Sequence, residues 1–316
     1  MPTAFLDHPR PVAFAHRGGA AHAPENSWRA FEHAVGLGYR YLETALQATS
    51  DGVLIAFHDR TLDRVTGREG RISRMTHREV SKALIAGTEP IPVIEDLIMA
   101  WPDVRFNFDL KDAPAIAPLA RLLRRTAAWD RVCVVSFSAS RLRAARRLFD
   151  QPVCMAASPV GNAAVRLGGP MWGAAARAQR HPASALVPPR EAGQPGEPDE
   201  PPPAATGAEP EEDAAGAAAA GKFSAYLALA DRLARAGVRC AQVPAAVASQ
   251  AFVARAHALG LHVHAWTVNS TATMGELLDI GVDGIMTDQT VALRDLLIRR
   301  GEWHPRQPAG PATPAR

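Results

Sequence analysis

The chain has 316 residues, 47% of them hydrophobic, so it is long enough to bury the core of one large domain. Its 35 basic and 32 acidic residues leave a formal net charge of only +3, and no basic stripe with interleaved aromatics indicates a nucleic-acid surface. We find neither a signal peptide nor a run of about 18 apolar residues, so we expect no membrane insertion and a cytoplasmic location.

Short apolar runs alternate with longer segments whose apolar residues recur about every 3.6 positions. This alternation is typical of parallel strands joined by helices, and runs that are apolar on both faces suit a sheet covered by helices. The predicted strands are Val12–Ala15, Tyr41–Leu46, Val53–Phe57, Val104–Leu110, Val132–Phe137, Val153–Ala157, Cys240–Val243, His262–Trp266 and Gly284–Thr287. The predicted helices include Trp28–Leu37, Ile94–Trp101, Ala115–Ala127, Ser140–Leu148, Leu227–Ala236, Gln250–Leu259 and Thr273–Ile280.

Nine strands are one more than a closed eight-stranded barrel needs. Residues 47–52 are too few for a crossover helix, and they contain the turn sequence Ser50-Asp51-Gly52. We therefore expect the second and third runs to form a hairpin.

Residues of about 180–221 are rich in Pro, Ala, Gly and Glu and nearly lack large apolar side chains. Such a segment cannot bury enough surface to offset the entropy of ordering, so we expect a disordered insertion before the seventh run. The Pro-rich residues 302–316 are expected to form a disordered tail. The domain prediction is one barrel over residues 1–301, interrupted by the insertion.

The three cysteines, Cys133, Cys154 and Cys240, are widely spaced, and each lies in an apolar run. No CxxC pair is present, so we expect buried thiols rather than a metal or redox site. Reduced thiols suit a reducing compartment.

Polar and charged side chains occur at the ends of several predicted strands, which in barrels form the rim of the active site. The clearest positions are His16-Arg17, His58, Asp109 and Lys111, and the second run contains Glu43. Such groups are costly to bury unpaired, so their convergence indicates a functional site. The alternative is that they form ion pairs that close one end of the barrel.

An ordered series of motifs resembles the glycerophosphodiester phosphodiesterases, a family of phospholipase C-like barrels. The motifs are HRGG from residue 16, PENS from 24, Glu43, SDG from 50, HD from 58, DLK from 109, SF from 136, WTVN from 266 and GVDGIMTD from 281. The resemblance spans residues 12–298 and implies a TIM-type (β/α)8 barrel. It also implies a divalent cation, Ca²⁺ or Mg²⁺, and hydrolysis of glycerophosphodiesters to an alcohol and glycerol 3-phosphate.

By position in these motifs, His16 and His58 correspond to the acid/base pair. Histidine titrates near neutral pH and can take a proton from an attacking hydroxyl or give one to a leaving alkoxide. Arg17 and Lys111 correspond to cations that neutralise the phosphate, as charge accumulates on its oxygens in the transition state. For Arg17, a salt bridge at the rim is the alternative.

Phe137 and Trp266 are expected to line the glycerol pocket, although aromatic residues at strand ends often belong to the core. We expect Glu25 and Asn26 to fix the loop after the first strand rather than to act on substrate.

The resemblance fails at one metal position. The family has a Glu-x-Asp pair on the second strand, whereas this chain has Glu43-Thr44-Ala45. With Asp109 from the fourth run, two carboxylates remain where three are expected, so the affinity for a hard cation should fall. Gln47 could supply a neutral oxygen only if the strand bulges.

Three explanations stay open: a weakened enzyme, a relative that kept binding but lost catalysis, or an introduced substitution. The expected partner is a small glycerophosphodiester, and the oligomeric state cannot be predicted. The main alternative function is a non-catalytic phosphoester-binding protein.

Overall fold

The computed structural model describes residues 4–167 and 232–305. These residues belong to one of two compact units, which consists of Met1–Leu167 and Ala230–Arg316. The segment 180–221, predicted to be a disordered insertion, lies outside the described residues.

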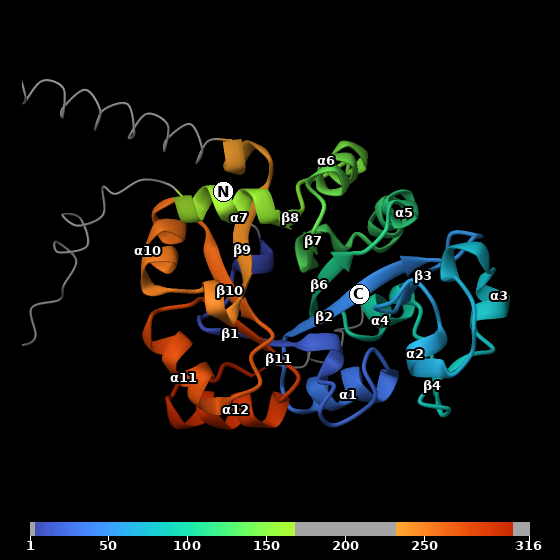
Figure 1. Cartoon of the computed structure of the whole chain (residues 1–316), viewed down its shortest axis with the longest axis horizontal. Coiled ribbons are helices and arrows are strands. Elements are labelled where there is room, and N and C mark those ends of the chain that lie inside the picture. The colour runs from blue at the N-terminus through green and yellow to red at the C-terminus, as the bar shows by residue number, and fades with distance from the viewer. Residues whose placement is uncertain (1–3, 168–231, 306–316) are drawn as a thin grey trace, which may run out of the picture. The chain divides into compact units, whose positions relative to one another are not determined.

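Eight parallel strands close into a barrel in the described unit (Figure 1). The first strand, β1, pairs with both β2 and β11, which closes the ring. The predicted (β/α)8 barrel is thus confirmed. Its strands are β1 (Val12–Ala15), β2 (Tyr41–Ala48), β6 (Arg105–Leu110), β7 (Val132–Val135), β8 (Cys154–Ala156), β9 (Val238–Pro244), β10 (His262–Trp266) and β11 (Gly284–Thr287).

The predicted strand in excess of eight is the third run, β3 (Leu54–Ala56), which pairs antiparallel with β2 and lies outside the barrel wall. The predicted hairpin is therefore present, with Gln47 opposite Ile55. Because β3 does not belong to the barrel, the seventh predicted run, β9, is the sixth barrel strand. A further small sheet of β4 (Leu84–Ile85) and β5 (Glu89–Pro90) follows, which the sequence did not indicate.

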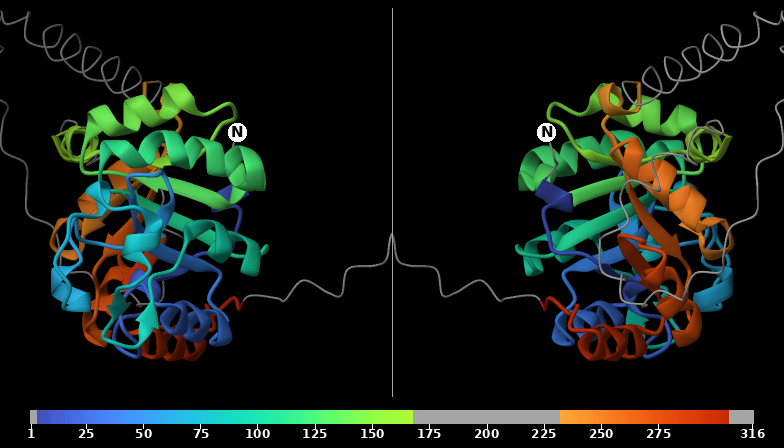
Figure 2. Two further views of the ribbon diagram at one scale, coloured as in Figure 1. Left: turned by 90° about the vertical axis from the view of Figure 1, so that its right-hand side faces the viewer. Right: turned by 90° about the vertical axis from the view of Figure 1, so that its left-hand side faces the viewer.

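Helices cover the outside of the strands, as the two side views in Figure 2 show. The longer helices pack apolar residues on the barrel; Ile116, Leu119 and Leu123 of α5, for example, are buried. The main helices are α1 (Trp28–Gly36), α4 (Ile94–Ala100), α5 (Ile116–Thr126), α6 (Ala139–Leu148), α7 (Pro159–Leu167), α10 (Gln250–Ala258), α11 (Thr271–Asp279) and α12 (Thr290–Arg299), with the short α2 (Asp63–Thr66) and α3 (His77–Val80) beside β3. Among the described residues, no helix has the length and apolar character needed to cross a membrane.

Inside the barrel, a separate apolar cluster fills the interior, with members from six different barrel strands. It includes Phe14, Tyr41 and Met286, and the segment Ala4–Leu6 adds Phe5. The hydroxyl of Tyr41 donates to the carbonyl of Phe5 at 2.6 Å, which satisfies its polar group inside this layer. The interior is thus packed with side chains, so a substrate-sized ligand can bind only at its ends.

The start of the predicted tail is also described. Trp303 is half-buried and packs against Tyr39, with 5.3 Å between the ring centroids. Arg40 donates to the carbonyl of Pro305. Residues 306–316 lie outside the described part.

Candidate active site

A cavity of about 480 Å³ lies at the carboxyl ends of the barrel strands. All eight residues that the motifs assigned to a site line it: His16, Arg17, Glu43, His58, Asp109, Lys111, Phe137 and Trp266. The structure therefore brings together residues that are up to 250 positions apart in the sequence. Parallel strands explain this, because their carboxyl ends all meet at one end of the barrel.

A tight turn after β1 presents His16 and Arg17 to the cavity. Arg17, Gly18 and Gly19 all have positive φ, at 50°, 84° and 94°. A Cβ on Gly18 would lie 2.8 Å from the Cβ of Ala30 in α1, so only glycine allows the turn to pack on the helix. The HRGG motif is thus a requirement of the backbone at the rim of the cavity.

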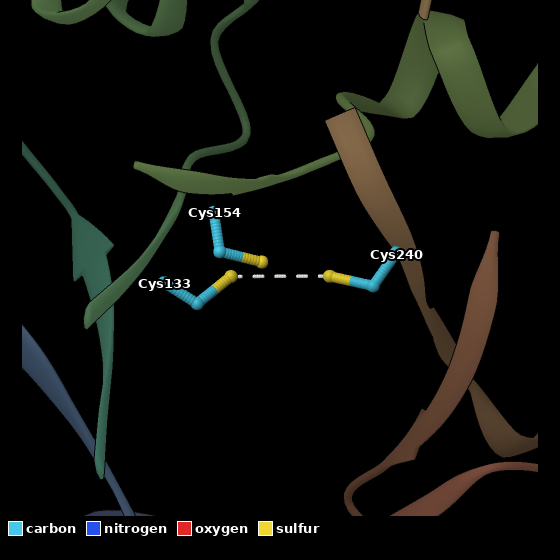
Figure 3. Close-up of side chains that lie close together, drawn as sticks. All are labelled: Cys133, Cys154 and Cys240. Atoms are coloured by element: carbon cyan, nitrogen blue, oxygen red, sulfur yellow. Dashed lines mark hydrogen bonds between the residues drawn. The ribbon is translucent and has the colours of Figure 1, made fainter. Parts of the chain in front are cut away.

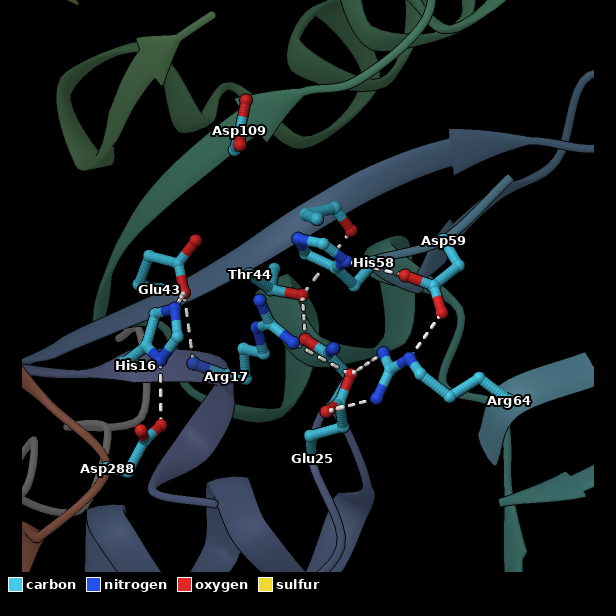
Figure 4. A network of polar contacts seen from close by, with 12 residues as sticks. His16, Arg17, Glu25, Glu43, Thr44, His58, Asp59, Arg64, Asp109 and Asp288 are labelled. Atoms are coloured by element: carbon cyan, nitrogen blue, oxygen red, sulfur yellow. Dashed lines mark hydrogen bonds and ion pairs between the residues drawn. The ribbon is translucent and has the colours of Figure 1, made fainter. Parts of the chain in front are cut away.

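A carboxylate holds His16 at each ring nitrogen. Its Nδ1 lies 2.7 Å from Oδ1 of Asp288, and its Nε2 lies 3.9 Å from Oε2 of Glu43 (Figure 4). Asn269 positions Asp288 by donating to its Oδ2 and accepting from its backbone N–H. Burial opposes the charged form of the ring, but Glu43 and Asp288 outweigh it and raise the pKa of His16.

A carboxylate also anchors Nδ1 of His58, but the pKa of His58 is displaced in the opposite direction. Its Nδ1 lies 2.7 Å from Asp59, which Arg64 holds in turn (Figure 4). Burial lowers the pKa of His58, and the charges of Lys111 and Arg17 add to this against the bond from Asp59. The two histidines thus have pKa values displaced in opposite directions, which is how a site separates an acid from a base.

Arg17 both lines the cavity and forms an ion pair. Its Nη1 donates to Glu25 at 3.0 Å, and Glu25 also accepts two bonds from Arg64. Asn26, with a positive φ of 56°, accepts a hydrogen bond from the hydroxyl of Thr44. Glu25 and Asn26 therefore support the first loop, as expected, and the salt bridge proposed as the alternative for Arg17 is present.

Two carboxylates face the position where the family motif implies a metal. Glu43 is 6% exposed and accepts from the backbone N–H of Arg17. Asp109 pairs its Oδ2 with Lys111 at 2.6 Å, whereas its Oδ1 is buried without a hydrogen bond to any described residue. Burial raises the pKa of Glu43, partly offset by His16.

Ala45 lies two residues after Glu43 on β2 and is the direct neighbour of Asp109 across the β2–β6 pair. Its side chain is buried at 1% exposure and supplies no oxygen. Neither Ala45 nor Gln47 is among the residues that line the cavity, and the amide nitrogen of Gln47 donates to the carbonyl of His58. The carboxylate of Glu43 and that of Asp109, with its unpartnered Oδ1, fit a hard cation. They supply one anionic ligand fewer than the family pattern.

The remaining walls of the cavity are mostly apolar. Phe137 is 62% exposed and meets Trp266 edge to face, with 5.8 Å between ring centroids. The ammonium of Lys111 lies 5.7 Å from the centroid of Phe137. Asn107 and Gln242 form a buried pair of side-chain amides at the base of the cavity, with bonds of 2.7 and 3.2 Å.

Comparison with known proteins agrees with this geometry. A model of the glycerophosphoryl diester phosphodiesterase family matches residues 16–160 and 205–292. The chain therefore belongs to this family. A probable glycerophosphodiester phosphodiesterase 2 of Mycobacterium tuberculosis is 36% identical over 305 residues, covering 95% of each chain.

Solved structures of phosphodiesterases share the fold. A putative glycerophosphoryl diester phosphodiesterase from Silicibacter pomeroyi has a TM-score of 0.65 at 21% identity, covering 95% of this chain and 99% of that one. A phosphodiesterase from Oleispira antarctica, solved with the product sn-glycerol-3-phosphate, has a TM-score of 0.64 at 18% identity, covering 92% and 97%.

The motifs did not reveal the residues that hold the histidines. Asp59 and Asp288 both belong to quoted motifs of the phosphodiesterase pattern, HD and GVDGIMTD, yet their partners could not be assigned from sequence. Asn107 and Gln242 carried no signal at all, because each lies inside a strand whose register is needed to pair them.

Proposed function

We propose that this phosphoric diester hydrolase cleaves glycerophosphodiesters to an alcohol and glycerol 3-phosphate, with His16 and His58 as acid and base. Membership of the phosphodiesterase family supports the reaction class. One observation supports the roles most: both histidines line one cavity, and each is anchored at Nδ1 by a carboxylate. Anchoring fixes the ring orientation that proton transfer needs.

His16 is the general acid in this proposal. Its raised pKa favours the protonated ring, which can give a proton to the leaving oxygen. His58, with its lowered pKa, stays neutral and takes the proton from the attacking hydroxyl. Asp288 and Asp59 act through these rings, because each accepts from Nδ1 and leaves Nε2 directed to other partners.

Arg17 and Lys111 bind the phosphate. Both line the cavity together with the histidines, and fixed positive charge there stabilises the charge that develops on the phosphoryl oxygens. Phe137 and Trp266 supply the apolar wall against which the carbon skeleton of the glycerol lies.

Glu43 and Asp109 would hold a divalent cation, Ca²⁺ or Mg²⁺. When bound, such an ion neutralises the phosphodiester and polarises its phosphorus–oxygen bonds. The missing carboxylate at Ala45 weakens this site, so activity should require a high concentration of metal.

Ala45 also favours a second candidate, a protein that binds phosphoesters without cleaving them. The hydrolase and the binder differ in whether glycerol 3-phosphate is formed. Phosphorus NMR of glycerophosphocholine incubated with the protein and millimolar Ca²⁺ or Mg²⁺ should show glycerol 3-phosphate appear. An unchanged spectrum, together with saturable binding of the diester by calorimetry, would instead establish the binder. The cytoplasmic location stays a prediction.

A further inference from the structure

The cysteines outside the proposed catalytic machinery form a cluster inside the barrel. Cys133 of β7, Cys154 of β8 and Cys240 of β9 come from three neighbouring strands, and their sulfurs all lie within 4.8 Å of one another (Figure 3). The Sγ atoms of Cys133 and Cys240 are 3.8 Å apart, too far for a disulfide bond of about 2.0 Å. The chain has no other cysteine.

The three sulfurs are spaced as the ligands of a metal–thiolate site. A central ion about 2.3 Å from each sulfur, the usual metal–thiolate distance, separates the sulfurs by about 3.3 Å in a pyramidal complex such as that of arsenic(III) and by about 4.0 Å in a planar one. Only small rotations of side chains from the observed positions would be needed. Strand pairing fixes the geometry, because Cys133 and Cys154 are direct partners and Cys240 pairs with Ala156, beside a register shift.

The surroundings select which ion fits. The cluster lies among Phe5, Phe14, Tyr41 and Met286, and all three cysteines are at most 1% exposed. Burial raises the pKa of Cys133 well above its usual value, so a bare thiolate is unfavourable here. A complex of three thiolates with a monovalent or divalent ion carries net negative charge, which this apolar layer would oppose.

A trivalent ion removes that cost. We propose that Cys133, Cys154 and Cys240 form a three-sulfur binding site for a trivalent thiophilic ion, of which arsenic(III) is the simplest. Arsenous acid, As(OH)₃, reacts with three thiols without oxidation or reduction. Three S–H and three As–O bonds break, three As–S bonds form, and three water molecules leave. Reactants and product are all neutral, so no charge is buried.

The coordination number agrees with this choice. Zinc in structural sites takes four ligands, whereas the cluster within the described residues has three members. The route of entry is the cavity, because Gln242 lines its base and lies 3.9 Å from the sulfur of Cys240.

The test is to incubate the reduced protein with sodium arsenite, remove unbound arsenic on a desalting column, and measure arsenic per chain by mass spectrometry. One arsenic per chain is expected. Each of Cys133→Ala, Cys154→Ala and Cys240→Ala should weaken binding by roughly 100-fold or more, because one of three linked ligands is lost. Met155→Leu, which removes a neighbouring sulfur on the opposite face of β8, should bind as the parent does.

Three further measurements keep the test valid if access is slow or a variant folds poorly. The parent is also refolded from guanidinium in the presence of arsenite, and circular dichroism checks each variant. In the folded parent, arsenite should slow alkylation of all three cysteines by N-ethylmaleimide. The proposal is overturned if the parent retains no arsenic by either route, or if a folded Cys154→Ala variant binds as tightly as the parent.

Discussion

Ala45→Asp restores the carboxylate that the family pattern has on β2, and its consequences follow from where Ala45 lies. The residue is buried and is the direct β-sheet partner of Asp109. Adjacent strands are about 4.8 Å apart, so two carboxylates there would repel each other by about 3 kcal/mol at an effective dielectric constant of 20. Without metal, the variant should therefore be less stable than the parent.

When a divalent cation is bound, the added carboxylate should stabilise the protein instead of destabilising it. The new carboxylate attracts the ion, and after desolvation we expect a net gain of about 1.4–4 kcal/mol in metal binding, or 10- to 1000-fold in affinity. The metal concentration that gives half-maximal hydrolysis should fall by the same factor. The rate should follow metal occupancy.

The assay is a thermal melt and a hydrolysis rate, each measured across a Ca²⁺ or Mg²⁺ titration and in EDTA. In EDTA, a loss of about 3 kcal/mol lowers Tm by roughly 6–12 °C for a domain of this size, and metal should restore it. Ala45→Asn is the matched control, because it supplies an oxygen of similar position without the charge. The reasoning is refuted if the parent already binds metal tightly, or if Ala45→Asp and Ala45→Asn behave alike.

Three other predictions concern the acid/base pair and the turn that carries it. Replacing Asp288 by Asn removes a carboxylate that raises the pKa of His16, so the alkaline limb of the kcat/KM profile should move to lower pH while the acid limb stays. Replacing Asp59 by Asn removes a bond that raises the pKa of His58, so the acid limb should move to lower pH, and an alkaline shift instead would contradict the assignment. Gly18→Ala should cost about 1–3 kcal/mol of unfolding free energy in a denaturant melt, from positive φ and the clash with Ala30. The control Gly67→Ala, also at positive φ but with open space around it, should cost only about 1 kcal/mol.

The sequence predicted the barrel because each strand carries its own signal. Apolar runs such as Val132–Phe137 and Gly284–Thr287 are dense enough to mark strands without any knowledge of their partners. The turn at Ser50-Asp51-Gly52 likewise predicted the β2–β3 hairpin. The pair β4–β5 and the hydrogen bond from Gln47 to the backbone of His58 carried no comparable local pattern.

The residues that make up the site could be predicted from the sequence, whereas the hydrogen bonds and ion pairs between them could not. Motif positions placed His16, His58 and Asp109 at strand ends and Glu43 within the second strand, and parallel strands bring such ends together. Which carboxylate holds which histidine depends on the register between strands and on loop paths. The cysteines show the same limit: the burial of Cys133 was predicted correctly, but its proximity to Cys240 depends on strand order and a bulge.

The most direct test of the proposed function is the time course of glycerol 3-phosphate release from glycerophosphocholine at saturating Ca²⁺. The parent, His16→Ala and His58→Ala are compared, each checked for fold by circular dichroism. The account predicts release by the parent and a loss of about 10²-fold or more in each variant, the scale of acid/base catalysis. Equal rates in the parent and either folded variant would remove that histidine from the mechanism, and no release by the parent would contradict the proposed activity.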